Sequence, residues 1–256
     1  MSQLKPINTV FANWPAPKTI HAFTTTRLGG QSVGPYAGFN LGERCGDDPD
    51  CVAENRQRLS LDLPHQPLWL HQVHGTEVLR LPIRDSHQQS TEQALQADAV
   101  WTSVPYQVCA VLTADCLPVL LCDQAGTRVA AAHAGWKGLL HGVLERTVEA
   151  LSCPPDQLLA WMGPAIAQPA FEVGPEVREA FLLQDAEAEQ AFIPGQADRW
   201  HADIYALARI RLAKLGLNRV FGQPICTYSD PQRFYSFRRD GITGRMASLI
   251  WLDTTV

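Results

Sequence analysis

The chain has 256 residues, of which 46% are hydrophobic and 18% charged, a composition typical of a globular protein with a sizeable buried core. Its formal net charge of -5 argues against binding through a basic surface, so we expect no nucleic-acid partner. No stretch approaches the about 18 apolar residues of a membrane span, and the N-terminal segment lacks the pattern of a secretion signal. We therefore expect no membrane partner and a cytoplasmic location.

The number and spacing of the cysteines are typical of a protein in a reducing compartment. The chain has seven of them, an odd number, and they are widely spaced. A disulfide framework is therefore not expected, and most of these residues should be buried as small hydrophobic side chains.

The first half of the chain predicts mostly strands, because β-branched and aromatic residues alternate with turn residues. A single helix should begin near Pro49, with Asp47 or Asp48 as its N-cap. In chain order we expect a strand running into a turn over 19–30, that helix, a strand–turn–strand unit over 68–81, an exposed loop over 84–96, and strands over 97–103 and 107–123.

The second half predicts helices interspersed with strands. Apolar residues recur at helical spacing over 135–151, which indicates an amphipathic helix. In chain order we expect a strand over 127–135, this helix, a strand over 158–164, helices over 174–184 and 203–216, and strands over 219–228 and 245–252. Strands dominate and no linker or internal repeat divides the chain, so we predict a single α+β domain over residues 1–256 with mixed sheets covered by helices.

Three local motifs could carry chemistry. They are "HQVHG" with His71 and His74, "ADC" with Asp115 and Cys116, and "AAAHAG" with His133. Each lies where a predicted strand ends, which is where a rigid element can present a side chain to a ligand.

The three motifs allow two interpretations. Two imidazoles and a thiolate are the ligand set of a catalytic zinc site with an open position, but a cysteine beside a histidine is also typical of a nucleophile. The spacing does not separate the two. By contrast, Cys109 and Cys122 stand among Val, Ala and Leu and are expected to be packing residues.

Cationic residues near glycines are candidates for binding an anion. Arg27 precedes Gly29 and Gly30, and the C-terminal segment "SFRRDGITGR" holds Arg238, Arg239 and Arg245. Guanidinium groups suit phosphate and carboxylate, although a surface loop explains this segment equally well.

These motifs, taken together, resemble the YfiH-like family, variously described as laccase-domain proteins, purine nucleoside phosphorylases and peptidoglycan editing factors. The resemblance spans almost the whole chain. It rests on "TTTRLGGQSVGPYAGFNLGERCGDDPDCVAENR", "WLHQVHGTEV", "ADAVWT", "LTADCLPVLL", "AAAHAGWKGLLHGVLERTV", "GPAIAQPAFEVGPEV" and "CTYSDPQRFYSFRRDGITGRMASLI".

The resemblance implies a fold, a metal site and an activity. The fold would be an αββα-type layered sandwich with mixed sheets. His71, Cys116 and His133 would bind a metal, usually zinc, with copper as the alternative metal. The activity would be phosphorolysis of adenosine, inosine and methylthioadenosine, with phosphate as co-substrate, together with adenosine deamination.

Three functions follow, in order of preference. The first is a zinc-dependent purine nucleoside phosphorylase, in which Arg27, Arg238 and Arg239 bind substrate and Asp98 or Asp115 moves a proton beside the metal. Zinc would suit the deamination because it brings the pKa of bound water near ~7. The partners would be a nucleoside and phosphate, and the sequence identifies no partner protein.

The alternatives use the same residues differently. In the first, Cys116 and His133 form a hydrolase of the amidase type that edits a peptidoglycan precursor. The second is a copper-dependent polyphenol oxidase, or laccase. A multicopper centre needs about ten histidines, many in H-x-H pairs, and the chain has 8 histidines, none of them in such a pair, which argues against this second alternative.

Overall fold

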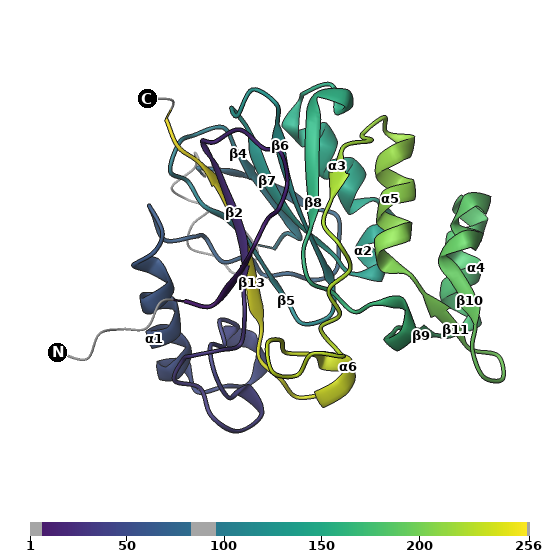
Figure 1. The fold of residues 1–256 in the computed structure, drawn as a ribbon, viewed down its shortest axis with the longest axis horizontal. Coiled ribbons are helices and arrows are strands. Elements are labelled where there is room, and N and C mark those ends of the chain that lie inside the picture. The colour runs from purple at the N-terminus through teal and green to yellow at the C-terminus, as the bar shows by residue number, and fades with distance from the viewer. Residues whose placement is uncertain (1–6, 83–95, 255–256) are drawn as a thin grey trace.

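In the computed structural model, which describes residues 7–82 and 96–254, two β-sheets are stacked and helices cover both outer faces (Figure 1). The loop predicted over 84–96 lies almost entirely outside these residues. Among the described helices, none has the length and apolar character of a membrane span.

The larger sheet of the described residues has six strands and is mixed. Two neighbouring pairs, at its two edges, run parallel, and the others run antiparallel. In spatial order the strands are β12 (Val220–Phe221), β8 (Leu158–Met162), β6 (Leu117–Asp123), β7 (Val129–Ala134), β4 (Ala99–Thr102) and β3 (Val78–Leu81).

Two smaller sheets are antiparallel throughout. The one stacked on the larger sheet contains, in spatial order, β1 (Thr9–Phe11), β2 (Ile20–Thr25), β13 (Met246–Leu252) and β5 (Cys109–Thr113). The other extends from one side of the molecule and contains β10 (Phe192–Pro194), β11 (Trp200–Ala202) and β9 (Glu172–Val173).

The helices alternate irregularly with the strands, as predicted. The α-helices are α1 (Pro49–Ser60), α2 (Trp136–His141), α3 (Val143–Leu151), α4 (Pro175–Gln184), α5 (Ile204–Lys214) and α6 (Phe237–Asp240). Short 3-10 turns span Gly34–Tyr36, Glu43–Cys45, Pro155–Gln157, Gln168–Ala170 and Ala186–Ala191.

Side-chain alternation along the strands explains the layers. On β6, Val119 and Leu121 pack against the helices α2, α3 and α5, whereas Leu120 between them faces the smaller sheet. On the outer face of that sheet, Leu249 of β13 packs with Leu59 of α1. The layers are therefore α, β, β and α, and the predicted α+β sandwich is confirmed.

The apolar run at 108–123 changes from one sheet to the other. Its first part is β5 of the smaller sheet and its second part is β6 of the larger one, with the break at Asp115 where the sequence predicts it. Asp115 has φ 92°, a left-handed conformation that costs energy for a residue with a side chain. The crossing places Cys116 where the ends of the two sheets meet.

Three local predictions fare differently. Helix α1 begins at Pro49, and the side chain of Asp48 caps it by accepting the N–H of Asp50, as expected. The helix over 135–151 is broken at Gly142, which has φ 99° and separates α2 from α3. Over 68–81 only β3 is a strand, and the residues before it form irregular backbone.

All seven cysteines lie in the described residues and are free thiols, which confirms that no disulfide framework is present. Cys109 and Cys122 are fully buried, as expected for packing residues. The other five are half-buried, so the expectation that most of the cysteines are buried is wrong.

Candidate active site

Three potential metal ligands meet at the end of the stacked sheets. His133 lies on β7 and turns toward the smaller sheet, as Val129 and Ala131 do. Cys116 immediately precedes β6, and His74 comes from the irregular segment before β3. One ligand atom from each of His74, Cys116 and His133 lies within 4.8 Å of the other two, and no other group of this kind occurs in the described ranges.

The structure brings His74, and not the predicted His71, to Cys116 and His133. His71 lines the same cavity but forms an isolated β-bridge with Gln96 and lies outside the cluster. The reason is local, because the backbone turns at His74, which has φ 61°. The structure therefore supports His74, and not His71, as the third candidate ligand beside Cys116 and His133.

The carboxylate of Asp98 holds both histidines in place. It is fully buried and accepts a hydrogen bond from Nδ1 of His133 at 2.8 Å. It also accepts the backbone N–H groups of Val73, His74 and Gly75 at 3.1, 2.9 and 2.7 Å, so that it closes the turn that carries the His74 ring. Asp98 does not line the cavity, and its geometry supports a positioning role instead of the predicted proton transfer.

The cluster favours a thiolate on Cys116. Burial alone would raise the pKa of this thiol, but the charge and hydrogen bond of His133, helped by His74, lower it to about 6. Burial would in turn lower the pKa of His133, but Cys116 and Asp98 raise it to about 9. These opposite shifts favour a thiolate on Cys116 beside a protonated His133.

Gly135 allows the ligands to approach each other. A Cβ atom at this position would lie 2.8 Å from Cδ2 of His74 and 3.0 Å from Sγ of Cys116. Because glycine has no Cβ atom, the start of helix α2 can lie against the cluster without pushing the side chains of His74 and Cys116 apart.

The donor set fits a zinc ion. Tetrahedral zinc holds sulfur at about 2.3 Å and nitrogen at about 2.0 Å, which separates the two ligand atoms by about 3.5 Å. The observed distance from Sγ of Cys116 to Nε2 of His74 is 3.7 Å. Because Asp98 occupies Nδ1 of His133, Nε2 of that ring is the nitrogen left for a metal. Two imidazoles and one thiolate are also a copper ligand set.

Asp115 connects the ligand cluster to the C-terminal segment. One of its carboxylate oxygens accepts the hydroxyl of Thr227 at 2.6 Å, and the other accepts the hydroxyl of Ser236 at 3.0 Å and the backbone N–H of Arg238 at 2.7 Å. One oxygen thus fixes the start of α6 beside Cys116, and the other fixes Thr227. This arrangement again supports positioning, and not the proton transfer that we predicted for Asp115.

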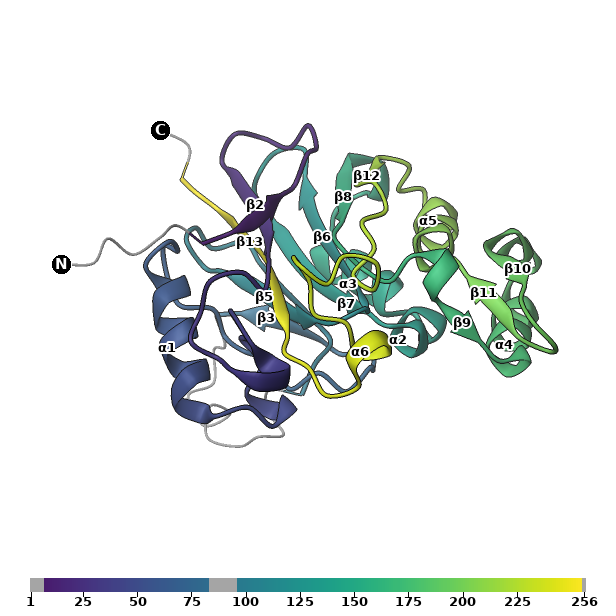
Figure 2. The same ribbon diagram turned by 60° about the horizontal axis from the view of Figure 1, so that its bottom comes forward.

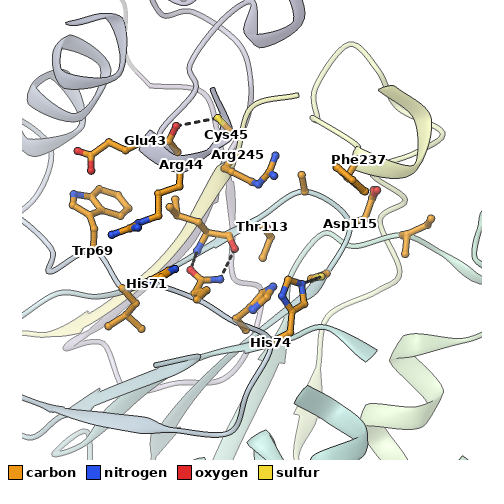
Figure 3. A pocket seen from close by; sticks show the side chains of 18 of the residues that line it. Glu43, Arg44, Cys45, Trp69, His71, His74, Thr113, Asp115, Phe237 and Arg245 are labelled. Atoms are coloured by element: carbon orange, nitrogen blue, oxygen red, sulfur yellow. Dashed lines mark hydrogen bonds between the residues drawn. The ribbon is translucent and has the colours of Figure 1, made fainter. Parts of the chain in front are cut away.

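The cluster opens into a cavity of about 870 Å³, a size that accommodates a small organic ligand. Figure 3 shows His74 and Asp115 toward one side of this cavity and Arg44 and Trp69 toward the other, with Arg245 between them. Residues of the short helices α6 and α2, both labelled in Figure 2, line the cavity.

One of the three arginines predicted to bind substrate lines the cavity. Arg238 follows the N-cap of α6, donates from one terminal nitrogen to the carbonyl of Glu172 at 2.7 Å, and lies over the ring of Phe171. Its neighbour Phe237, which no sequence motif identifies, also lines the cavity and is 59% exposed.

Arg239, the second of the predicted arginines, lies outside the cavity lining. It donates to the main-chain carbonyls of Thr227, Tyr228 and Phe234 and pairs with Asp240. All three of its guanidinium nitrogens are engaged in these contacts, so Arg239 fixes the fold of this segment.

Arg27, the third, also lies outside the cavity lining. It donates to the carbonyls of Ala37 and Pro231 and stacks on the ring of Tyr235. Its role in the described structure is therefore to tie the segment near Ala37 to the C-terminal segment. Neither its position nor its contacts direct it toward the cluster.

Comparisons with known proteins agree with this architecture. A solved structure from Neisseria meningitidis, described as family DUF152, superposes with a TM-score of 0.89 at 45% identity and covers 96% of this chain and 100% of that one. The Bacillus licheniformis protein YfiH superposes with a TM-score of 0.85 at 26% identity, with 98% of each chain covered.

Curated relatives cover nearly the full chain. The Escherichia coli protein named purine nucleoside phosphorylase YfiH is 53% identical over 245 residues, which are 95% of this chain and 98% of that protein. A Pseudomonas aeruginosa protein, also named a purine nucleoside phosphorylase, is 52% identical over 94% of this chain and 97% of its own length. The model of the family described as multi-copper polyphenol oxidoreductase laccase matches residues 21–253, and the chain belongs to this family.

Proposed function

We propose that the chain is a metal-dependent purine nucleoside phosphorylase that acts on adenosine, inosine and methylthioadenosine and also deaminates adenosine. The observation that carries the proposal is the cluster of His74, Cys116 and His133, which opens into a ligand-sized cavity. The relatives named purine nucleoside phosphorylases, at 53 and 52% identity, support the choice of substrate.

In this proposal His74, Cys116 and His133 hold zinc, with copper as the second candidate. When bound, the metal supplies Lewis-acid stabilisation and activation of water. Asp98 keeps the proton on Nδ1 of His133 and so directs the other ring nitrogen toward the cavity.

The cavity wall supplies the remaining contacts. During phosphorolysis, an oxygen of hydrogen phosphate forms a bond to C1′ of the ribose while the bond from C1′ to the base nitrogen breaks. The proton that the phosphate gives up is taken up by the departing base. Arg238 offers the guanidinium donors that have no partner among the described residues to the charge that is shared between phosphate and ribose. The exposed ring of Phe237 offers a surface on which a purine can stack.

The decisive experiment combines metal analysis with product analysis. Purified protein is assayed for bound metals and then given inosine and phosphate, and we expect hypoxanthine and ribose 1-phosphate in equal amounts. Adenosine without phosphate should yield inosine and ammonia. Metal-loaded protein that leaves every nucleoside unchanged in the presence of phosphate contradicts the proposal.

Cys116→Ala tests the role of the cluster. This variant should stay folded and lose both metal and activity, since it removes the thiolate ligand. Cys153→Ala is the matched control, because Cys153 is also a half-buried thiol but does not line the cavity. Unchanged metal content in Cys116→Ala would remove this residue from the ligand set.

One observation favours a second candidate function. The lowered pKa of Cys116 beside His133 suits a nucleophile as well as a ligand, as in an amidase-type hydrolase that acts on a peptidoglycan precursor. Intact-mass analysis after incubation with candidate amides separates the two, because a covalent adduct on Cys116 is expected of the hydrolase alone.

The family description also names a copper oxidase activity, and this third function has its own test. Copper-loaded protein would be given a polyphenol and oxygen. Sustained oxygen consumption that depends on His74 would favour the oxidase.

A further inference from the structure

Arg245 has an unusually fixed side chain at the cavity wall. One terminal nitrogen of its guanidinium donates to the carbonyls of Thr243 and Gly244 at 2.7 and 2.9 Å. Its backbone N–H is bound by the side-chain oxygen of Asn40 at 2.7 Å. Its aliphatic stem lies against Gly42, where a Cβ atom would come within 2.7 Å of Cγ.

This anchoring leaves one edge of the guanidinium facing away from the carbonyls that hold it. Among the described residues, Nε and the second terminal nitrogen of Arg245 make no hydrogen bond and no ion pair. That edge presents two parallel N–H donors, the geometry that binds two oxygens of a phosphate or carboxylate. Because the other nitrogen is already held, little side-chain freedom is lost when an anion binds.

The charges around the cavity leave room for an anion. The carboxylate of Glu43 is paired with Arg56, whose Nε is also taken by the carbonyl of Leu41. The carboxylate of Asp115 accepts three hydrogen bonds within the protein. The acidic groups of the lining are thus engaged, while Arg245 keeps an open pair of donors in the same cavity.

We propose that Arg245 binds the phosphate co-substrate through Nε and its second terminal nitrogen. The inference rests on the proposed phosphorylase function and identifies which of the candidate anion-binding residues Arg27, Arg238, Arg239 and Arg245 recognises phosphate. Two phosphate oxygens accept the two N–H groups, and a further phosphate oxygen stays free for attack on the ribose.

The test is Arg245→Lys, which keeps the charge but removes the two-donor edge. Binding of inorganic phosphate to the metal-loaded protein is measured by titration calorimetry, and the KM for phosphate is measured with inosine. Loss of a charged hydrogen bond predicts that the Kd and the KM for phosphate both rise by about tenfold or more, while the KM for inosine changes little.

Arg128→Lys is the matched control. Arg128 also donates one terminal nitrogen to a main-chain carbonyl, that of Ser152, but it does not line the cavity. The phosphate affinity of this variant should equal that of the unsubstituted protein. Bound metal is measured in both variants, because a loss of metal on Arg245→Lys would mean that the substitution disturbs the site as a whole and would overturn the inference.

The outcomes distinguish this inference from the proposed function. If the unsubstituted protein binds phosphate and Arg245→Lys does not, Arg245 is the phosphate site even where no nucleoside is turned over. If nucleosides are phosphorolysed and the KM for phosphate is unchanged in Arg245→Lys, the inference fails and the function stands. A rise in the KM for inosine alone would assign Arg245 to the nucleoside and likewise overturn the inference.

Discussion

The carboxylate of Asp98 lies 2.8 Å from Nδ1 of His133 and also accepts the backbone N–H of His74 at 2.9 Å. One buried side chain therefore orients two of the three potential ligands, although His74 and His133 lie 59 positions apart in the chain. Burial would raise the pKa of this carboxyl, but the hydrogen bonds from His133 and from the backbone of Gly75 and Val73 hold it below its usual range. The lowered pKa favours the ionised form of Asp98, which is the form that accepts the hydrogen bonds from His133 and from the turn at His74.

Asp98→Asn should weaken metal binding while the sheet remains folded. The amide keeps the size of the side chain but loses the charge and one acceptor, so that the His133 ring and the turn at His74 are no longer both held. We expect a loss of about 10–100-fold in metal affinity, measured by competition with a chromophoric chelator.

The control for this variant is Asp123→Asn. Asp123 is also a buried carboxylate that accepts backbone N–H groups, but it lies at the other end of β6 from Cys116. Both variants should lose stability to heat, and only Asp98→Asn should lose metal affinity. Equal metal affinity in the two variants would show that Asp98 does not position the ligands.

His74→Ala and His71→Ala separate the two histidines of the "HQVHG" motif. His74 contributes a ligand atom to the cluster and His71 does not. We expect a loss of metal affinity of about 100-fold or more for His74→Ala and a far smaller effect for His71→Ala. Elemental analysis of the two purified variants is the measurement, and the opposite order would restore the ligand set that the sequence predicted.

The sequence predicts the fold better than it predicts the site. Strand patterns depend on alternation that persists over several residues, so the break at Asp115 and the cap at Asp48 could be located from local chemistry alone. The choice between His71 and His74 could not, because it depends on a backbone turn at His74 that is closed by Asp98, a residue distant in the sequence.

The arginines illustrate the same difference. Their density near the C-terminus indicates an anion site, but the sequence does not show which donors the protein itself uses. Arg239 directs its donors to carbonyls of its own segment, whereas Arg238 lines the cavity, and within the described part of the chain only one of its terminal nitrogens has a partner. That distinction is made by main-chain carbonyls, whose positions depend on the complete fold.

Gly135→Ala should weaken the metal site by crowding. The new methyl group would meet His74 at 2.8 Å and Cys116 at 3.0 Å, so at least one ligand must move. We expect the metal affinity to fall by about tenfold, because substitutions that disturb the surroundings of a metal ligand typically cause losses of this size.

A double substitution shows whether this loss acts through His74. In a His74→Ala background the space beside Gly135 is open, and adding Gly135→Ala should reduce metal affinity much less than it does alone. Fully additive effects would mean that the methyl group acts elsewhere.

The thiol of Cys116 should be reactive at low pH when the metal is removed. Its pKa is lowered to about 6 against burial by the charge of His133, so the thiolate is present above that pH and is lost as the pH falls through it. An ordinary cysteine titrates near ~8.5. Metal-free protein is alkylated with iodoacetamide, and the modification of Cys116 is followed by peptide mass mapping. We expect the rate, plotted against pH, to have its midpoint at a pH of about 6.

Cys122 provides the internal control, since burial raises the pKa of its thiol to about 12 and should leave it unmodified. His133→Gln removes the stabilising charge and should move the midpoint for Cys116 upward; an unchanged midpoint would show that His133 does not stabilise the thiolate.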